Sequence, residues 1–186
     1  GEPVIDLEGL ANHKGSAFGH LGQAAQPTQE MFENKLALEL LRISSGSPAS
    51  EARPCWVEDE SQRIGTVLVP PAFYKQMRKA PCYFLDIPFE ERLQYIARDY
   101  GKADRDKLVN AVMRIQKRLG GLETKTAINC ILEQDIPGAF SILLKYYDKW
   151  YLKGLYNREP DCPPIVNIPA AKVDEHENAQ LLLQLR

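Results

Sequence analysis

The sequence predicts an α/β fold built on a mainly parallel β-sheet. Three short apolar runs, at residues 3–7, 54–59 and 80–87, have the composition of strands, and helical patterns separate them. Strands that alternate with helices are typical of βαβ units. Each run is almost continuously apolar, as expected for a strand that is covered on both faces. A fourth run of this kind, at 163–170, comes late in the chain.

Helical periodicity predicts most of the remaining elements. The clearest helix covers 28–42, where Pro27 and Thr28 open a segment with an apolar stripe. Residues 44–54 are rich in Ser, Gly and Pro and predict a loop. Further helices are expected at 89–101, 104–121, 122–135, 136–156 and 174–185.

The 186-residue chain has a net charge of only -2, but its acidic and basic residues are unevenly distributed along the sequence. Residues 75–158 carry 16 basic and 10 acidic side chains. Such a cationic middle favours a phosphate-rich partner, although solvated amphipathic helices have the same composition. We expect an α/β core at 1–88, a helical basic region at 89–158, and a final strand and helix at 159–186 that return to the core.

Composition also excludes several classes of protein. No apolar run approaches the roughly 20 residues of a membrane helix, and no signal peptide opens the chain, so we expect a cytoplasmic protein. The cysteines are far apart and form no C-x-x-C pair, so we predict neither a metal site nor a disulfide framework. Cys55 and Cys82 lie in strand-like runs and are expected to be buried, inert thiols.

Acidic residues end three of the predicted strands: Asp6 with Glu8, then Glu58 to Glu60, then Asp86. Ligands of open parallel sheets bind beyond the carboxyl ends of the strands, so these residues mark the functional edge. The pattern favours a P-loop NTPase type of sheet. The phosphate cradle G-x-x-x-x-G-K-[ST] does not occur, and its nearest imitation, Gly120 to Thr126, lies between helices. We therefore expect an incomplete sheet whose first strand and P-loop are missing from this sequence.

The segment "DLEGLANHKGSAFG" (Asp6 to Gly19), at the end of the first predicted strand, is expected to form a long loop at this edge. Glycines there, Gly15 among them, permit positive φ angles and close approach of the backbone to a ligand. The alternative is a solvated loop in which the histidine is merely exposed. The candidate phosphate or substrate ligands are Asp6, Glu8, Gly9, Asn12, His13, Lys14, Ser16 and Gly19.

Two further groups are candidates for the same phosphate or substrate site. Glu58, Glu60, Ser61 and Arg63 follow the second strand, where they could hold Mg²⁺ directly or through water. The alternative is a helix N-terminus with favourably placed acids. Arg92 and Arg98 nearly share one helix face and suit bidentate phosphate contacts, although such arginines also occur on solvated faces.

The run "KYYDKWYLKGLYNR" (145–158) interleaves aromatic and basic residues. This composition is typical of surfaces that bind unstacked bases, and it is also typical of a helix that buries its aromatic face. The candidate RNA-binding residues are Lys145, Tyr146, Tyr147, Lys149 and Trp150.

Four blocks in order resemble the C-terminal P-loop domain of bacterial tRNA 2-selenouridine synthases: residues 4–19, 26–40, 56–65 with 69–81, and 88–101, with 143–151 extending the match. The resemblance implies a transferase that geranylates 2-thiouridine at the wobble position of tRNA with geranyl diphosphate. Selenium from selenophosphate then replaces the sulfur.

The resemblance also implies an N-terminal rhodanese-like domain with a catalytic cysteine as a partner in the same protein. Nothing in this sequence resembles that domain, so the catalytic residues stay unknown and this chain alone is expected to be inactive. The glycine-rich segment would then wrap a diphosphate or the target nucleotide. Implied partners are the tRNA anticodon region and the two phosphate-bearing co-substrates, with no certain cofactor and Mg²⁺ as a candidate. The alternatives are a P-loop small-molecule kinase and a non-catalytic RNA-binding module.

Overall fold

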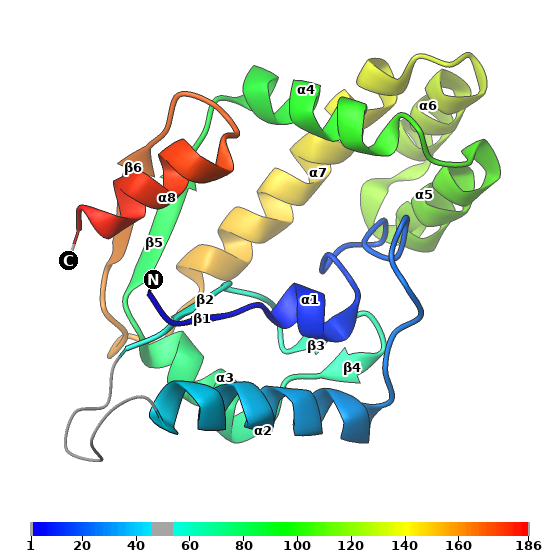
Figure 1. Ribbon diagram of the computed structural model, residues 1–186. Helices are drawn as coiled ribbons and strands as arrows, with labels where there is room; N and C mark the ends of the chain where they lie inside the picture. Colours follow the sequence, from blue (N-terminus) through cyan, green and yellow to red (C-terminus); the bar gives the residue numbers. More distant parts are fainter. Residues whose placement is uncertain (1, 46–53, 186) are drawn as a thin grey trace. The chain divides into compact units, whose positions relative to one another are not determined.

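The computed structural model describes residues 2–45 and 54–185 of the chain (Figure 1). It divides into two compact units, Gly1–Lys79 and Ala80–Arg186. The predicted loop at 44–54 falls largely outside the described residues. Within the described ranges, no helix is both long enough and apolar enough to cross a membrane.

The first unit is built from short elements. Strands β1 and β2 run parallel, with Val4 opposite Trp56 and Ile5 opposite Val57. Strands β3 and β4 form an antiparallel hairpin. The elements of this unit are β1 (Val4–Ile5), α1 (Leu7–Ala11), α2 (Gln29–Ser45), β2 (Trp56–Val57), β3 (Arg63–Ile64), β4 (Val67–Leu68) and α3 (Pro71–Lys79).

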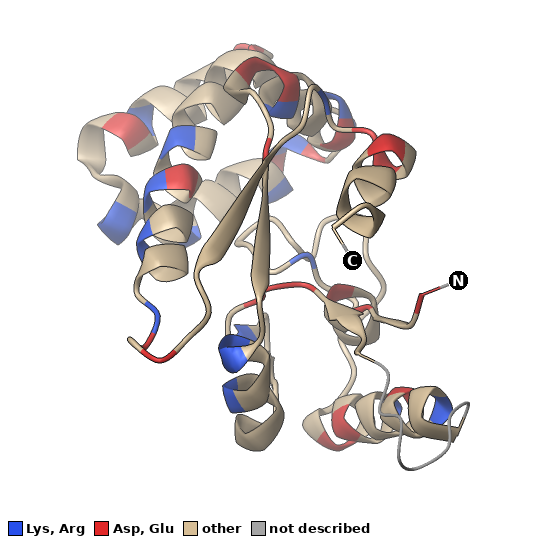
Figure 2. Cartoon of the chain, turned by 90° about the vertical axis from the view of Figure 1, so that its left-hand side faces the viewer, with Lys and Arg blue, Asp and Glu red and all other residues tan. Residues whose placement is uncertain are grey.

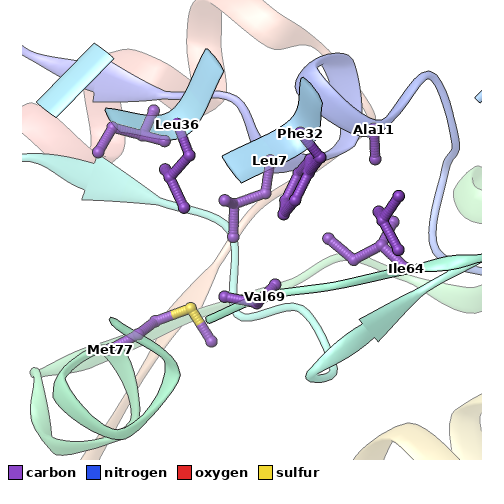
Figure 3. Packing of buried hydrophobic residues seen from close by; sticks show 9 residues of the cluster. Leu7, Ala11, Phe32, Leu36, Ile64, Val69 and Met77 are labelled. Carbon is purple, nitrogen blue, oxygen red and sulfur yellow. The ribbon is translucent and has the colours of Figure 1, made fainter. Parts of the chain in front are cut away.

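One hydrophobic cluster holds these short elements together (Figure 3). Helix α2 buries Phe32 and Leu36 against Leu7 of α1 and against Ile64 and Val69 of the hairpin region. Each such side chain stabilises the fold by roughly 1.5–3 kcal/mol when it is fully removed from water. The strands alone are two residues long, so this cluster, rather than strand pairing, fixes their positions.

Two glutamines attach the hairpin to α2 and its preceding segment. Gln26 Nε2 donates to the carbonyl oxygens of Ala11 (3.1 Å) and Ile64 (3.0 Å), while its Oε1 accepts from Thr66 N at 2.8 Å. Gln29 pairs both of its amide atoms with the backbone of Leu68, each at 2.8 Å. The two primary amides therefore act as additional strand partners for backbone groups that the short hairpin leaves unpaired.

The second unit is dominated by helices. Strands β5 and β6 pair in parallel, from Cys82 opposite Ile165 to Asp86 opposite Pro169. Asp104, Asp135 and Asp174 each cap the helix that follows them, accepting a backbone hydrogen bond three residues on. The elements are β5 (Cys82–Asp86), α4 (Phe89–Tyr100), α5 (Arg105–Leu119), α6 (Gly121–Leu132), α7 (Ile136–Tyr156), β6 (Ile165–Pro169) and α8 (Glu175–Leu183).

Helix α7 is the packing centre of the second unit. Helix α6 packs on it and on α5, and α4 packs on it separately (Figure 1). Tyr100 of α4 stacks on Phe140 of α7 with ring centroids 5.4 Å apart. Leu108, Ile131 and Leu143 are buried where the helices meet. The core thus uses the N-terminal half of α7, whereas residues 149–156 are exposed except for the buried Leu155.

Every predicted strand and helix has a counterpart in the structure, with the strands shorter than expected. Two pairs of strands are parallel and one is antiparallel, in three separate two-stranded sheets among the described residues. A single, mainly parallel and incomplete sheet therefore stays a prediction, as do the three predicted domain ranges. Cys82 is buried as expected, whereas Cys55 is half-buried.

One sequence-based expectation and one of the alternatives are wrong. Residues Leu7–Ala11 are helical rather than part of a long loop, because Asp6 caps the segment and Leu7 and Ala11 supply a buried face. Gly9 has a low helix propensity, so the sequence does not predict this short helix. Likewise, the residues after Glu60 lead into the β3–β4 hairpin rather than into a helix N-terminus.

Candidate functional site

The carboxyl ends of β1 and β2 bring acidic side chains together. Because the two strands are parallel and in register, Asp6 and Glu58 leave them at the same level. Glu58 Oε2 accepts a hydrogen bond from Leu7 N at 2.9 Å, and Asp6 Oδ1 accepts one from Gly9 N at 2.6 Å. Figure 2 shows the acidic stretch that follows β2 beside the acidic residues of α1. We call Asp6, Glu8, Glu58 and Glu60 the acidic cluster.

Two members of the acidic cluster share a proton. Burial, followed by the charge of Glu60 and a hydrogen bond with its carboxyl group, raises the pKa of Glu8 to about 8. The pKa values of Glu58 and Glu60 are also raised, in both cases mainly by burial. Two carboxylates this close do not both ionise readily near neutral pH. The acidic cluster therefore holds a proton and carries less negative charge than its composition implies.

The described residues contain no group of three or more His, Cys, Asp or Glu side chains arranged to hold a metal ion. The cluster carboxyls instead bind each other and the backbone. An Mg²⁺ ion would have to displace the proton that Glu8 and Glu60 share, because it binds ionised oxygens. A role for Mg²⁺ stays a prediction.

The glycine-rich turn after α1 packs onto the acidic cluster. Asn12 ends α1 in the left-handed conformation (φ 50°), and its Nδ2 donates to Ala25 O at 2.9 Å. Gly15 has a φ of 65°, and a Cβ atom there would collide with the carboxylate of Glu60. At Gly19 a Cβ atom would lie 2.8 Å from Lys14 N. These two glycines permit the turn to close on itself and on Glu60.

The remaining predicted ligands of this turn differ in exposure. His13 is 8% exposed, so it is not the exposed histidine of the solvated-loop alternative. Ser16 is partly buried, and its Oγ accepts from Phe18 N at 3.2 Å. Lys14 is half-buried and supplies the positive charge nearest in sequence to the cluster. Gly9 lies inside α1, where a Cβ atom would meet the Asp6 carboxylate.

The segment between β2 and β3 is held by its own contacts. Arg78 of α3 binds both oxygens of Asp59, at 2.9 and 3.1 Å, in a largely buried ion pair. Ser61 Oγ donates to Arg63 O at 2.7 Å, and Arg63 is exposed on β3. The Asp59 ion pair, which the sequence did not reveal, fixes the two glutamates on either side of it.

Asp86, Arg92 and Arg98 belong to the second unit, whereas the acidic cluster belongs to the first. The Arg92 guanidinium binds both oxygens of Asp148, at 2.5 and 3.0 Å, and donates to Ile87 O at 2.9 Å. Arg98 is exposed and lies over the Tyr95 ring, 5.7 Å from its centroid. Arg92 thus joins α4 to α7, and phosphate binding by either arginine stays a prediction.

The predicted RNA-binding residues all lie on α7. The rings of Tyr146 and Tyr147 meet edge to face with centroids 5.1 Å apart, and Lys145 lies over the Phe89 ring. Lys149 is exposed, and Trp150 is 39% exposed.

Two cations around Trp150 were not among the candidate RNA-binding residues, although Lys153 belongs to the basic and aromatic run at 145–158. Lys153 Nζ lies 5.2 Å and Arg118 Cζ 5.7 Å from the Trp150 ring centroid. The three-residue spacing from Trp150 to Lys153 was a readable signal, because residues at that spacing lie on one side of a helix. Arg118 comes from α5, so no local sequence pattern predicts its contact with Trp150.

A groove between α5 and α6, with a volume of about 340 Å³, was also not foreseen. Its lining combines amides, a cation and one aliphatic side chain, from Gln116, Gly121, Thr124, Lys125, Ile128 and Asn129. Gly121, Thr124 and Lys125 belong to the stretch that imitates a phosphate cradle in the sequence, but none of the lining residues is a predicted site residue.

Comparison with known proteins covers nearly the whole chain. Residues 2–178 match the family model of the tRNA 2-selenouridine synthase AAA domain. Relatives named tRNA 2-selenouridine synthase come from Marinobacter nauticus (32% identical, over 79% of this chain and 47% of the relative) and Nitrosomonas eutropha (30%, 84% and 51%). Another, from Pseudomonas putida strain GB-1, is 32% identical over 98% of this chain and 52% of its own length.

The chain spans about half the length of the curated relatives it matches. No solved structure matches it. The family match extends across both units, from before β1 to within α8, and the relatives agree with it in name. This chain therefore belongs to the tRNA 2-selenouridine synthase AAA domain family.

Proposed function

We propose that this chain is part of a tRNA-modifying transferase that acts in the cytoplasm. The enzyme geranylates 2-thiouridine at the wobble position with geranyl diphosphate and then replaces the sulfur with selenium from selenophosphate. The observation that carries this proposal is the family match over residues 2–178, together with relatives named tRNA 2-selenouridine synthase.

The first unit offers a place for the phosphate-bearing co-substrates. Lys14 supplies a cation at the glycine-rich turn, next to the acidic cluster on which that turn packs through Gly15. The proton shared by Glu8 and Glu60 lowers the local negative charge, which would otherwise repel an anion. A protonated carboxyl group also donates a hydrogen bond, which an ionised one does not. We propose that a diphosphate oxygen meets Lys14 and this proton-bearing pair.

The test uses the full-length protein from which the chain derives, supplied with tRNA bearing 2-thiouridine, geranyl diphosphate and selenophosphate. Nucleosides released from the tRNA should contain geranylthiouridine and then selenouridine. A folded protein that produces neither from these substrates would contradict the proposed activity.

The binding role of the turn is tested separately with Lys14→Ala, because the buried His13 is a poorer probe. We expect about a tenfold loss of affinity for geranyl diphosphate, the effect of losing one charge-assisted contact. The matched control is Lys75→Ala, which removes an exposed cation from α3 of the same unit. Equal affinity of Lys14→Ala and the wild type would refute this site.

We propose further that the chain requires the rest of the protein, including a rhodanese-like domain, for catalysis. The 186-residue chain alone is expected to leave the tRNA unmodified in the same nucleoside assay. Any turnover by the isolated chain would show that its own residues suffice.

A further inference from the structure

The C-terminal half of α7 presents an indole ring among cations. The Arg118 and Lys153 cations lie within 6 Å of the Trp150 ring centroid. Lys149, the residue before Trp150, is exposed. More than a third of Trp150 stays exposed although these side chains lie over its ring. We call Arg118, Lys149, Trp150 and Lys153 the Trp150 surface.

The charge around the Trp150 surface is strongly one-sided. Residues 114–119 of α5 and 145–156 of α7 together carry six basic side chains and one acidic one, Asp148. Arg92 of α4 already binds both oxygens of that aspartate. The surface therefore complements a polyanion rather than a mixed-charge protein face, since protein–protein interfaces are depleted in lysine.

We propose that the Trp150 surface binds unstacked nucleotides of the tRNA, with a base on the indole ring and the neighbouring phosphates on Arg118, Lys149 and Lys153. This inference rests on the proposed function, because the substrate tRNA is the occupant. An aromatic ring accepts the face of any base, but the bases of a duplex already stack on each other. The surface therefore suits a loop or a single-stranded segment, and Trp150 is a binding residue here rather than a catalytic one.

The experiment measures tRNA affinity of the full-length protein by filter binding or anisotropy across a series of salt concentrations. Trp150→Ala is expected to weaken binding about tenfold, whereas Trp150→Phe, which keeps a ring, stays within about threefold of the wild type. The double variant Lys149→Ala/Lys153→Ala should make the slope of log K against log salt shallower by roughly 1.5. Lys107→Ala, which removes an exposed cation from the other end of α5, is the matched control and should leave the slope within about 0.5 of the wild type.

A second comparison separates stacking from charge. An RNA hairpin with the anticodon loop should compete with tRNA, and a duplex in which that loop is paired to its complement should compete at least tenfold less well. Unchanged affinity of Trp150→Ala, or equal competition by the duplex, overturns the inference. A Trp150 variant that loses a protein partner while still binding tRNA normally would also overturn it and assign the surface to that partner.

The nucleoside assay of the wild type keeps this inference distinct from the proposed function. If the wild-type protein forms selenouridine and Trp150→Ala binds tRNA as tightly as the wild type, the proposed function is supported and the Trp150 surface is refuted. The opposite result is that Trp150→Ala loses RNA affinity while the wild-type protein forms no modified nucleoside. That result supports the Trp150 surface and contradicts the proposed reaction.

Discussion

The two units of this chain differ in how many of their polar side chains are engaged in internal contacts. In the first unit, carboxylates and amides are engaged internally: Asp6 caps α1, Glu58 accepts from Leu7 N, and Gln26 bridges three backbone segments. In the second unit, aspartates cap three helices while many cations of the helices are exposed; Figure 2 shows where the basic residues lie along the chain. Polar side chains of the first unit thus hold short elements in place, whereas many cations of the second unit stay exposed to solvent.

The comparison shows that the length of the helices and strands determines how many backbone groups need hydrogen bonds from side chains. Strands of two residues leave many backbone groups without ladder partners, and side chains must supply them. Helices of 12 to 21 residues satisfy their own backbone and need side-chain help only at the ends. Four predictions follow this contrast from its largest consequence to its smallest.

The largest effect should come from the core of the first unit. Phe32→Ala is expected to cost about 3–5 kcal/mol in the free energy of unfolding, because the side chain is fully buried. Leu38→Ala on the same helix is the control and should cost less than about 0.5 kcal/mol, since Leu38 is 65% exposed. Urea titration followed by circular dichroism measures both. Retention of most helical signal after the first transition would show that the second unit unfolds on its own.

Gly15→Ala should be next, at about 2–3 kcal/mol, because the φ angle disfavours a side chain and the new Cβ collides with Glu60. Gly22 has a similar φ of 73° with no atom within 4 Å of a Cβ position. Gly22→Ala is therefore the matched control and should cost about 1 kcal/mol. The difference in thermal unfolding isolates the contact of the turn with the acidic cluster. Equal costs would mean that the turn does not press on Glu60.

Arg92→Ala should destabilise the second unit by about 1.5 kcal/mol, because it removes two bonds to Asp148 and leaves that aspartate without this partner. Both side chains are about 30% exposed, which limits the cost. Arg98→Ala, on the same helix, should change the free energy of unfolding by less than about 0.5 kcal/mol. If the two variants lose the same stability, Arg92 is not the joint between α4 and α7.

The smallest effect is a pH dependence confined to the first unit. The pKa of Glu8 rises from 4.5 to about 8 on folding, so the folded protein keeps a proton that the unfolded chain releases between these values. The free energy of unfolding should therefore fall as pH rises through this window, by about 1 kcal/mol because the group is only half-buried. Glu8→Gln should flatten the profile, whereas Glu30→Gln, an exposed control on α2, should leave it intact. A wild-type profile that rises from pH 5 to 8 would contradict the shared proton.

The long elements could be predicted because their signals are local. The helices of the second unit have caps at Asp104 and Asp135 and apolar periodicity, and they appear close to where the sequence places them. Helix α1 could not be found, because five residues with a central glycine carry no period. The gathering of Asp6 with Glu58 followed from the parallel-strand rule, which depends only on strand direction.

The contacts that define the candidate sites are tertiary and stayed hidden. The proton shared by Glu8 and Glu60 depends on burial that neither residue's neighbours in sequence reveal. Arg118 reaches the Trp150 ring from a different helix. The hydrogen bonds from Gln26 and Gln29 to the hairpin backbone could not be predicted either, because a glutamine in a loop or at a helix start has no distinctive sequence pattern.

Deamidation of either glutamine would change contacts that hold the first unit together. Deamidation of Gln26 would replace the donor group that faces the carbonyls of Ala11 and Ile64 with an acidic oxygen, turning two attractive contacts into repulsive ones. The same reaction at Gln29 would end its donation to Leu68 O while sparing the bond from Leu68 N. Loss of a single ammonia molecule at Gln26 would therefore loosen the β3–β4 hairpin from α1.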